Sequence, residues 1–139
     1  MVGAVLSEMS PKEILETYRT IAVVGMSKDP SKDAHTVPAY LKEQGYRIIP
    51  VNPTATEILG EKAYPSLTAV PDGYEIVDIF RPSDQVGPIV DEALAAGKAK
   101  AIWMQSGIVN EAAAARARAA GMYVIMDRCM RTEHRLHIR

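Results

Sequence analysis

The sequence has little cysteine and no long apolar run, and both absences limit where the protein can work. Cys129 is the single cysteine among 139 residues, so no intrachain disulfide can form. A reducing, cytoplasmic setting is the simplest interpretation. The N-terminus has no basic stretch followed by an apolar one, and no run of about 18 apolar residues occurs anywhere. We therefore expect neither a secretory leader nor a membrane-spanning segment, and no membrane partner.

An excess of charge of one sign is also missing. Sixteen Lys and Arg residues oppose 17 Asp and Glu residues, which leaves a formal net charge of −1. General nucleic-acid binders carry a strongly basic surface, so we expect no nucleic-acid partner. Hydrophobic residues make up 47% of the chain and charged residues 24%, which is typical of a globular protein. The length predicts a single domain over residues 1–139, with its core over about 10–134.

Five apolar stretches rich in β-branched residues predict buried strands. They cover residues 20–26, 46–51, 75–80, 101–104 and 123–126. Residues 52–72 predict a loop, with one helical turn near Thr56 and another near Ser66. Helical patterns separate the other strands, and this alternation predicts right-handed crossovers. The expected fold is therefore a Rossmann-like, doubly wound α/β domain with a mostly parallel five-stranded sheet and helices on both faces.

Capping residues and glycines predict the helix boundaries. Caps are expected at Ser10, Ser83 and Asn110, and helix ends at Gly45, Gly97 and Gly121. The helix before Gly45 is predicted over residues 38–44, because Pro38 would disturb a helix anywhere beyond its first turn. The basic tail over residues 128–139 predicts at least one further helical turn.

The loop after the first strand is a candidate phosphate site. Gly25 permits a tight turn, and the helix that follows presents free N–H groups that favour an anion. Ser27 adds a hydroxyl donor and Lys28 a cation. The motif is not G-x-G-x-x-G, because Ser27 and Pro30 occupy two of the glycine positions, and it is not a Walker loop. An ordinary strand-to-helix loop remains the alternative interpretation.

An acidic residue is missing after the second strand, where NAD-binding domains usually place one to accept the ribose hydroxyls. Val51 is followed by Asn52 and Pro53. An uncharged asparagine tolerates a neighbouring phosphate, so a phosphorylated ribose is favoured over NAD. The alternative is that Asn52 and Pro53 simply begin a turn.

A catalytic or metal-binding constellation is also missing. His134 and His137 lie in the basic tail without further ligand spacing. Asp33 and His35 are close enough in sequence for an acid–base pair, but Asp33 also fits a helix cap. Cys129 has no base nearby in sequence and is interpreted as a buried structural thiol. We predict no catalytic residues and no metal site.

The segments after the strands resemble one known family when taken together. They read IAVVGMSKDPSKDAH, IIPVNPTATEILGEKAYPSL, EIVDIFRPSD, AIWMQSGI and DRCM. This combination is similar to the stand-alone CoA-binding proteins, which resemble the N-terminal domain of the succinyl-CoA synthetase α subunit and of related acyl-CoA synthetases. The resemblance extends from about Ser10 to His134.

The resemblance implies that coenzyme A is the ligand and that its contacts lie in the loops after the strands. The implied contacts are Gly25, Ser27 and Lys28 at the phosphates; Val51, Asn52 and Pro53 beside the adenosine, with Lys62 at a phosphate; Phe80, Arg81 and Pro82 after the third strand; and Gln105, Ser106 and Gly107 near the pantetheine arm.

Two departures from the synthetases argue against a ligase reaction. The synthetase subunit continues into a domain with a phosphorylated histidine, which this sequence does not reach. Asp127–Met130 of this sequence also differs from the proline- and glycine-rich segment that the synthetases have at the same place. We expect a non-catalytic CoA or acyl-CoA binding protein that acts as a sensor, a carrier or a partner module, alone or as a homo-oligomer. An NAD(P)-linked oxidoreductase fragment, a partner-dependent acyl-CoA ligase subunit and a purely structural role are the alternatives.

Overall fold

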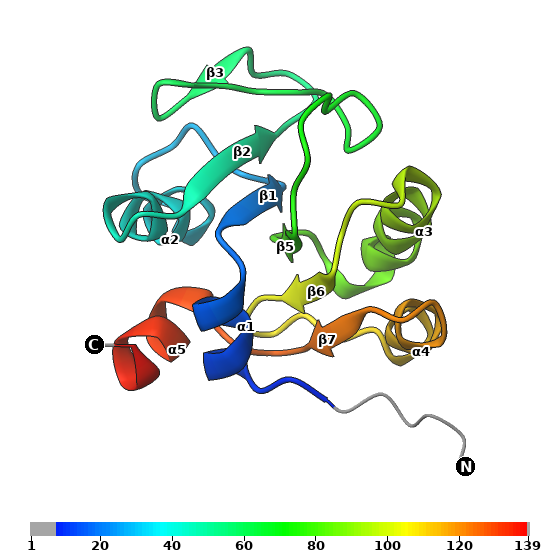
Figure 1. The fold of residues 1–139 in the computed structure, drawn as a ribbon. Helices are drawn as coiled ribbons and strands as arrows, with labels where there is room; N and C mark the ends of the chain where they lie inside the picture. Colours follow the sequence, from blue (N-terminus) through cyan, green and yellow to red (C-terminus); the bar gives the residue numbers. More distant parts are fainter. Residues whose placement is uncertain (1–7, 139) are drawn as a thin grey trace.

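The computed structural model describes residues 8–138. Its centre is a five-stranded sheet in the order β2-β1-β5-β6-β7, in which every neighbouring pair is parallel (Figure 1). The strands are β1 (Thr20–Val24), β2 (Arg47–Val51), β5 (Ile76–Ile79), β6 (Ala101–Met104) and β7 (Tyr123–Ile125). The predicted Rossmann-like α/β fold is confirmed.

Helices cover both faces of this sheet, as Figure 1 shows. On one face lie α1 (Pro11–Thr17), α2 (Asp33–Glu43) and α5 (Met130–His137). On the other lie α3 (Val86–Ala96), which follows the short 3₁₀ helix η1 (Ser83–Gln85), and α4 (Glu111–Ala119). None of the helices between residues 8 and 138 is both long enough and apolar enough to cross a bilayer.

Each face of the sheet builds its own apolar core. The first core contains α-helical side chains from α1, α2 and α5, namely Ile14, Leu15, Val37, Leu41 and Met130. The second contains side chains from α3 and α4, namely Val86, Val90, Ala93, Ala113, Ala114 and Ala117. Successive strand residues alternate between them, so Ile76 enters the first core and Val77 the second. Because both faces are buried, the strands read as continuous apolar runs.

Most predicted caps are confirmed. Ser10 forms a capping box with Glu13, and the Asn110 Oδ1 accepts a hydrogen bond from the Ala113 N–H (2.9 Å). The cap at Ser83 is wrong. Ser83 begins η1, its hydroxyl instead accepts a hydrogen bond from the Val109 N–H (3.0 Å), and α3 begins only at Val86. Ser83 therefore fixes the loop after β6 and not a helix end.

The predicted start of α2 is also wrong. The helix begins at Asp33, five residues before Pro38, so the proline lies in its interior. Pro38 has no N–H for the carbonyl of Ala34, one helical turn earlier. The backbone N–H of Ser27 donates to that carbonyl instead, at 3.1 Å. A donor from the loop after β1 thus compensates for the proline.

The segment after β2 contains a hairpin where a helical turn was predicted near Thr56. The antiparallel strands β3 (Glu57–Ile58) and β4 (Glu61–Lys62) are joined through Leu59 and Gly60, whose φ angles of 55° and 75° are both positive. Two positive angles define the tight hairpin turn that matches strand twist. Near Ser66 the chain forms a turn rather than a helix.

Candidate functional site

Two adjoining pockets lie where the strand order reverses. The chain passes from β1 outward to β2 and then returns to β5 on the other side of β1. Ligands of open α/β sheets bind at such a point, outside the carboxyl ends of the strands. Pocket A, of about 690 Å³, lies between the loops after β1 and β2 and the helices η1 and α3. Pocket B, of about 370 Å³, lies between the start of α2, the loops after β5 and β6, and Cys129. Arg81, which follows β5, lines both of them.

Gly25 brings the ends of three strands together at pocket A. Its N–H donates to the Val51 carbonyl (3.0 Å), and the Phe80 N–H donates to the Val24 carbonyl (2.9 Å). The φ angle of Gly25 is +85°, and a Cβ there would lie 2.5 Å from the Phe80 carbonyl oxygen. Only glycine allows this combination of conformation and close approach. The sequence prediction of a tight turn at this residue is confirmed.

Asn52 holds the loop after β2 against the loop after β1. Its Nδ2 donates to the Met26 carbonyl (2.9 Å), while its Oδ1 accepts from the N–H groups of Thr54 (2.8 Å) and Ala55 (2.9 Å). The two readings of Asn52 are therefore compatible, because the side chain both begins a turn and lines pocket A.

The loop between β1 and α2 is organised by its own hydrogen bonds. The Ser27 Oγ accepts from the Asp29 N–H (3.0 Å), and the Ser27 carbonyl oxygen lies 2.8 Å from His35 Nδ1. Hydrogen bonds from the backbone and hydroxyl of Ser31 lower the pKa of the exposed Asp29 carboxyl. His35 is thus held by the loop, and no contact joins it to Asp33 as an acid–base pair among the described residues.

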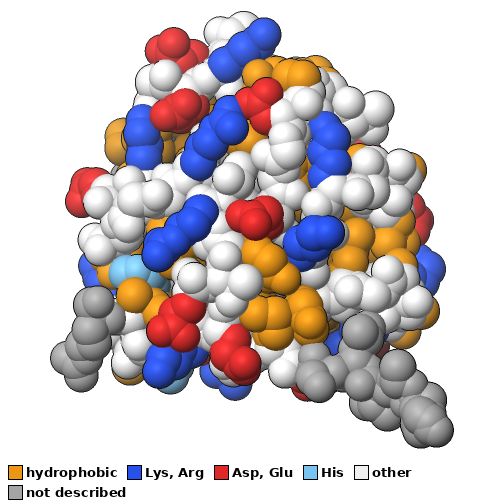
Figure 2. Space-filling model, viewed as in Figure 1, with side chains coloured by type: hydrophobic (Ala, Val, Ile, Leu, Met, Phe, Trp, Pro, Cys, Tyr) orange, Lys and Arg blue, Asp and Glu red, His pale blue; other side chains and the backbone are white. Residues whose placement is uncertain are grey.

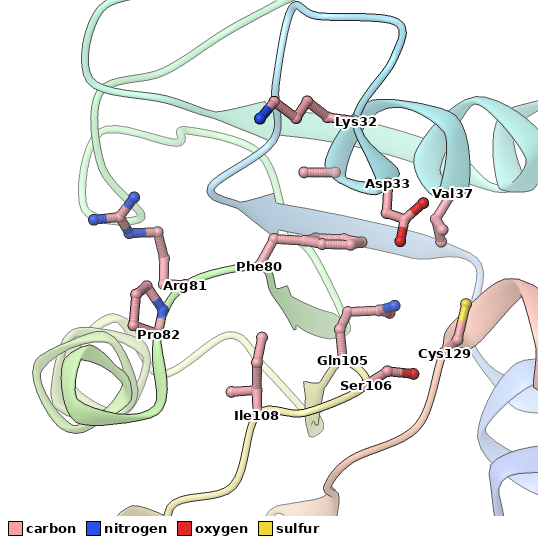
Figure 3. A pocket seen from close by; sticks show the side chains of 11 residues that line it. Lys32, Asp33, Val37, Phe80, Arg81, Pro82, Gln105, Ser106, Ile108 and Cys129 are labelled. Atoms are coloured by element: carbon pink, nitrogen blue, oxygen red, sulfur yellow. The ribbon is translucent and has the colours of Figure 1, made fainter.

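Pocket B is lined by a mixture of apolar, polar and charged side chains, including Lys32 and Asp33 at the start of α2 (Figure 3). Phe80, Pro82 and Ile108 supply apolar surface, while Gln105 and Ser106 supply amide and hydroxyl groups. The Gln105 side chain is buried, and its Oε1 accepts from the Met130 N–H (3.2 Å). This hydrogen bond fixes the start of α5 against the end of β6.

Cys129 is partly exposed and lines pocket B, so the prediction that it is buried is wrong, although its side chain packs against the first core. The sequence could not show this, because the exposure of a cysteine depends on which loops surround it. The pockets also include helical residues that carried no sequence signal, among them Gln85 and Glu92. A polar residue on the outer side of a helix looks the same in a sequence whether or not it faces a pocket.

The structure brings ten of the thirteen predicted contact residues to the two pockets. Those at pocket A are Gly25, Ser27, Val51, Asn52, Pro53 and Arg81, and those at pocket B are Phe80, Arg81, Pro82, Gln105 and Ser106. The other three lie outside both linings. Lys28 is exposed, the Lys62 ammonium lies 5.2 Å from the centre of the Tyr64 ring, and the Gly107 N–H donates to Asp127 Oδ1 (2.6 Å). Ligand contact itself stays a prediction for all thirteen.

The charged side chains on the surface and in pocket A are of both signs. Figure 2 shows Lys and Arg side chains interspersed with Asp and Glu over the described part of one face. Within pocket A, Glu92 is engaged by the Leu67 N–H (3.1 Å) and the Thr68 hydroxyl (2.9 Å). The Arg81 guanidinium donates to the Gln85 side chain and forms no ion pair within residues 8–138, although Asp84 and Glu92 line the same pocket.

The parallel sheet, with pockets at its switch point, places this protein in the class of Rossmann-like α/β domains. Within that class, the family model described as "CoA binding domain" matches residues 19–135, and the chain belongs to this family. The family resemblance predicted from the sequence is confirmed.

Three similar proteins illustrate the range of the family. The protein YneT of Bacillus subtilis is 41% identical over 128 residues, which cover 92% of this chain and 94% of that protein. The structure of a hypothetical protein from Pyrococcus horikoshii OT3 is similar to this one, with a TM-score of 0.88 and 40% sequence identity. The match covers 93% of this chain and 90% of the Pyrococcus chain. The ADP-forming acetate–CoA ligase II of Archaeoglobus fulgidus is 33% identical over 95 residues, or 67% of this chain but 14% of the ligase.

Proposed function

We propose that the chain binds CoA or an acyl-CoA across both pockets, with the nucleotide in pocket A and the pantetheine arm in pocket B. The observation that carries this proposal is Arg81, because it is a cation at the junction of two adjoining pockets. CoA has the matching form of a nucleotide joined through a diphosphate to a long arm. A diphosphate beside Arg81 would receive charge-assisted hydrogen bonds from its guanidinium.

Pocket A supports the nucleotide end of this arrangement. Val51, Pro53 and Ile89 supply apolar surface for a base, and Ser27 supplies a hydroxyl group. The start of α2 lies at pocket B and not at pocket A, so a phosphate in pocket A would be held by Ser27 and Arg81. Glu92 already accepts two hydrogen bonds, which reduces the effect of its charge on a bound anion.

Pocket B supports the pantetheine end. The arm of CoA is an apolar chain with two amide groups and a terminal thiol. The pocket offers Phe80 and Ile108 to the chain, and Gln105 and Ser106 to the amides. Small-molecule sites commonly combine such apolar walls with a few fixed polar groups.

The role we propose is binding without catalysis, as a sensor, carrier or partner module in the cytoplasm. A second candidate is a subunit or fragment that serves an acyl-CoA ligase. It is favoured by the match to 14% of the length of an acetate–CoA ligase, which means that a much larger protein contains a similar segment. Purification of the native protein from its source distinguishes the two, because a ligase role requires a larger partner to copurify in fixed proportion.

Thermal denaturation with CoA, acetyl-CoA, dephospho-CoA, NAD and NADP tests the proposal. A ligand at about a hundred times its dissociation constant adds about 2.7 kcal/mol to the free energy of unfolding. We expect CoA and acetyl-CoA to raise the melting temperature and dephospho-CoA to raise it less. Stabilisation by NAD or NADP alone, or no stabilisation by millimolar CoA, would contradict the proposal.

A further inference from the structure

Cys129 occupies the side of pocket B that lies away from Arg81. Figure 3 shows the cysteine at the start of α5, Arg81 on the opposite side, and the Phe80 ring between them. If the diphosphate of CoA lies at Arg81, its arm runs along the pocket toward Cys129. The inference that follows rests on the proposed function, because it concerns the thiol at the end of that arm.

The backbone on either side of Cys129 is fixed. The Trp103 indole Nε1 donates to the Arg128 carbonyl (2.8 Å), and the Met130 N–H donates to the Gln105 side chain (3.2 Å). Trp103 and Gln105 are both buried. The cysteine is therefore held in place on the pocket wall by two buried side chains rather than carried on a loose loop.

An unpartnered acid lies on the side of the sheet against which Cys129 packs. Asp78 is completely buried, and neither of its carboxyl oxygens has a hydrogen-bond partner among residues 8–138. It shares a face of the sheet with Phe80, two residues later on the chain, which lines pocket B. Burial, followed by the charge of Cys129, raises the pKa of the Asp78 carboxyl well above its usual range.

A buried polar group without a partner needs an explanation, and for Asp78 the explanation is that its carboxyl keeps a proton. A buried carboxyl that keeps its proton avoids the cost of a buried charge, so Asp78 brings no charge into the core against which Cys129 packs. Asp78 and Cys129 thus share one side of the sheet, and Cys129 lines the pocket in which the arm of CoA would end.

We propose that Cys129 captures CoA as a mixed disulfide, by exchange with a disulfide of CoA. The Cys129 thiolate attacks one sulfur of the CoA disulfide, a bond forms between the cysteine sulfur and the CoA sulfur, and the original sulfur–sulfur bond breaks. The leaving thiolate takes up the proton released by Cys129 and departs as free CoA. One thiol and one disulfide are consumed and one of each is formed, so the exchange needs no other oxidant.

The test compares two disulfides that have the same sulfur end. The reduced protein is incubated with CoA disulfide and, in parallel, with the same concentration of cystamine, which lacks the nucleotide. Intact-mass spectrometry follows the adduct, which can form only at Cys129 because the chain has no other cysteine. We expect CoA disulfide to react about tenfold faster or more, because binding raises the local concentration of the reacting sulfur. Excess adenosine 3′,5′-bisphosphate should remove this advantage.

The Cys129→Ser variant separates this inference from the proposed function. It should form no adduct and still be stabilised by CoA in thermal denaturation. Equal rates with the two disulfides, in a protein that CoA stabilises, would overturn the capture of CoA by Cys129 and leave the binding function intact. Equal rates in a protein that CoA does not stabilise would overturn both.

Discussion

The backbone N–H of Ser27 donates a hydrogen bond to the carbonyl oxygen of Ala34 at 3.1 Å. That carbonyl would normally accept from residue 38 of α2, which is proline. The hydrogen bond ties the loop after β1 to the first turn of the helix before any ligand is present. The candidate phosphate loop is therefore held in one conformation by the fold itself.

This relationship predicts a specific pattern of hydrogen exchange. The Ser27 amide should exchange slowly, because its acceptor lies in a helix, whereas the exposed Lys28 amide should exchange fast. Amide exchange followed by NMR on the ligand-free protein measures both. Fast exchange at Ser27 without ligand would show that the loop becomes ordered only on binding.

Replacement of Gly25 by alanine should destabilise the protein and damage both pockets. The new Cβ would lie 2.5 Å from the Phe80 carbonyl oxygen in a backbone with φ +85°, so both strain and a clash arise. We expect a loss of about 3 kcal/mol, measured by urea unfolding. Gly45→Ala is the matched control, because Gly45 has φ +97° and open space around it. Its loss should be only about 1 kcal/mol. Equal losses would show that Gly25 makes no essential close approach.

Asp78 should give the folded protein a characteristic dependence on pH. Burial raises the pKa of its carboxyl well above 3.8, so the folded state keeps a proton that the unfolded chain releases. The protonated Asp78 carboxyl makes its full contribution to the free energy of unfolding below the pKa that it has in the unfolded chain. This contribution decreases as the pH rises toward the pKa that the carboxyl has in the folded protein. Asp78→Asn removes this decrease and should raise the free energy of unfolding at about pH 7 by about 1–3 kcal/mol. Urea unfolding at several pH values measures the difference, and a less stable variant at neutral pH would contradict this account.

His134 should have the opposite effect in a different pH range. Burial, followed by the charge of Arg19, lowers the pKa of this imidazole below 6.5, so the folded state binds fewer protons than the unfolded chain. Stability should therefore fall as the pH drops below about 6.5, until the folded pKa is reached. The Tyr40 hydroxyl lies 2.8 Å from His134 Nδ1, which joins α2 to α5. His134→Gln should lose this acid sensitivity. A fall in stability of the same size in the variant would assign the effect to another group.

The sequence predicted those parts of the fold that depend on local chemistry. Asn110 caps a helix through its own side chain, and Gly97 ends one in a left-handed conformation with φ 68°, so both signals are visible in a few residues. The start of α2 could not be predicted, because it depends on a donor from Ser27 that only tertiary structure supplies. The β3–β4 hairpin was not predicted, because its turn contains Leu59, and leucine rarely adopts a φ angle of 55°.

The candidate site divides in the same way. Gly25, Asn52 and Arg81 were predictable because each follows a strand, and strand ends define the binding edge of a parallel sheet. Glu92 lies two turns inside a helix, and only packing brings it to pocket A. Cys129 was misjudged because a partly apolar side chain at a helix start is equally consistent with burial and with exposure to a pocket.

Isothermal titration of CoA into the wild type, Arg81→Gln and Lys100→Gln tests the central claim most directly. Lys100 is exposed and lies just before the amino end of β6, away from both pockets, so its variant removes one cation without touching the site. We predict binding of one CoA per chain to the wild type and to Lys100→Gln, with affinity weakened about tenfold or more in Arg81→Gln. Absence of binding to the wild type, or equal affinity in all three proteins, would contradict the placement of CoA across the two pockets.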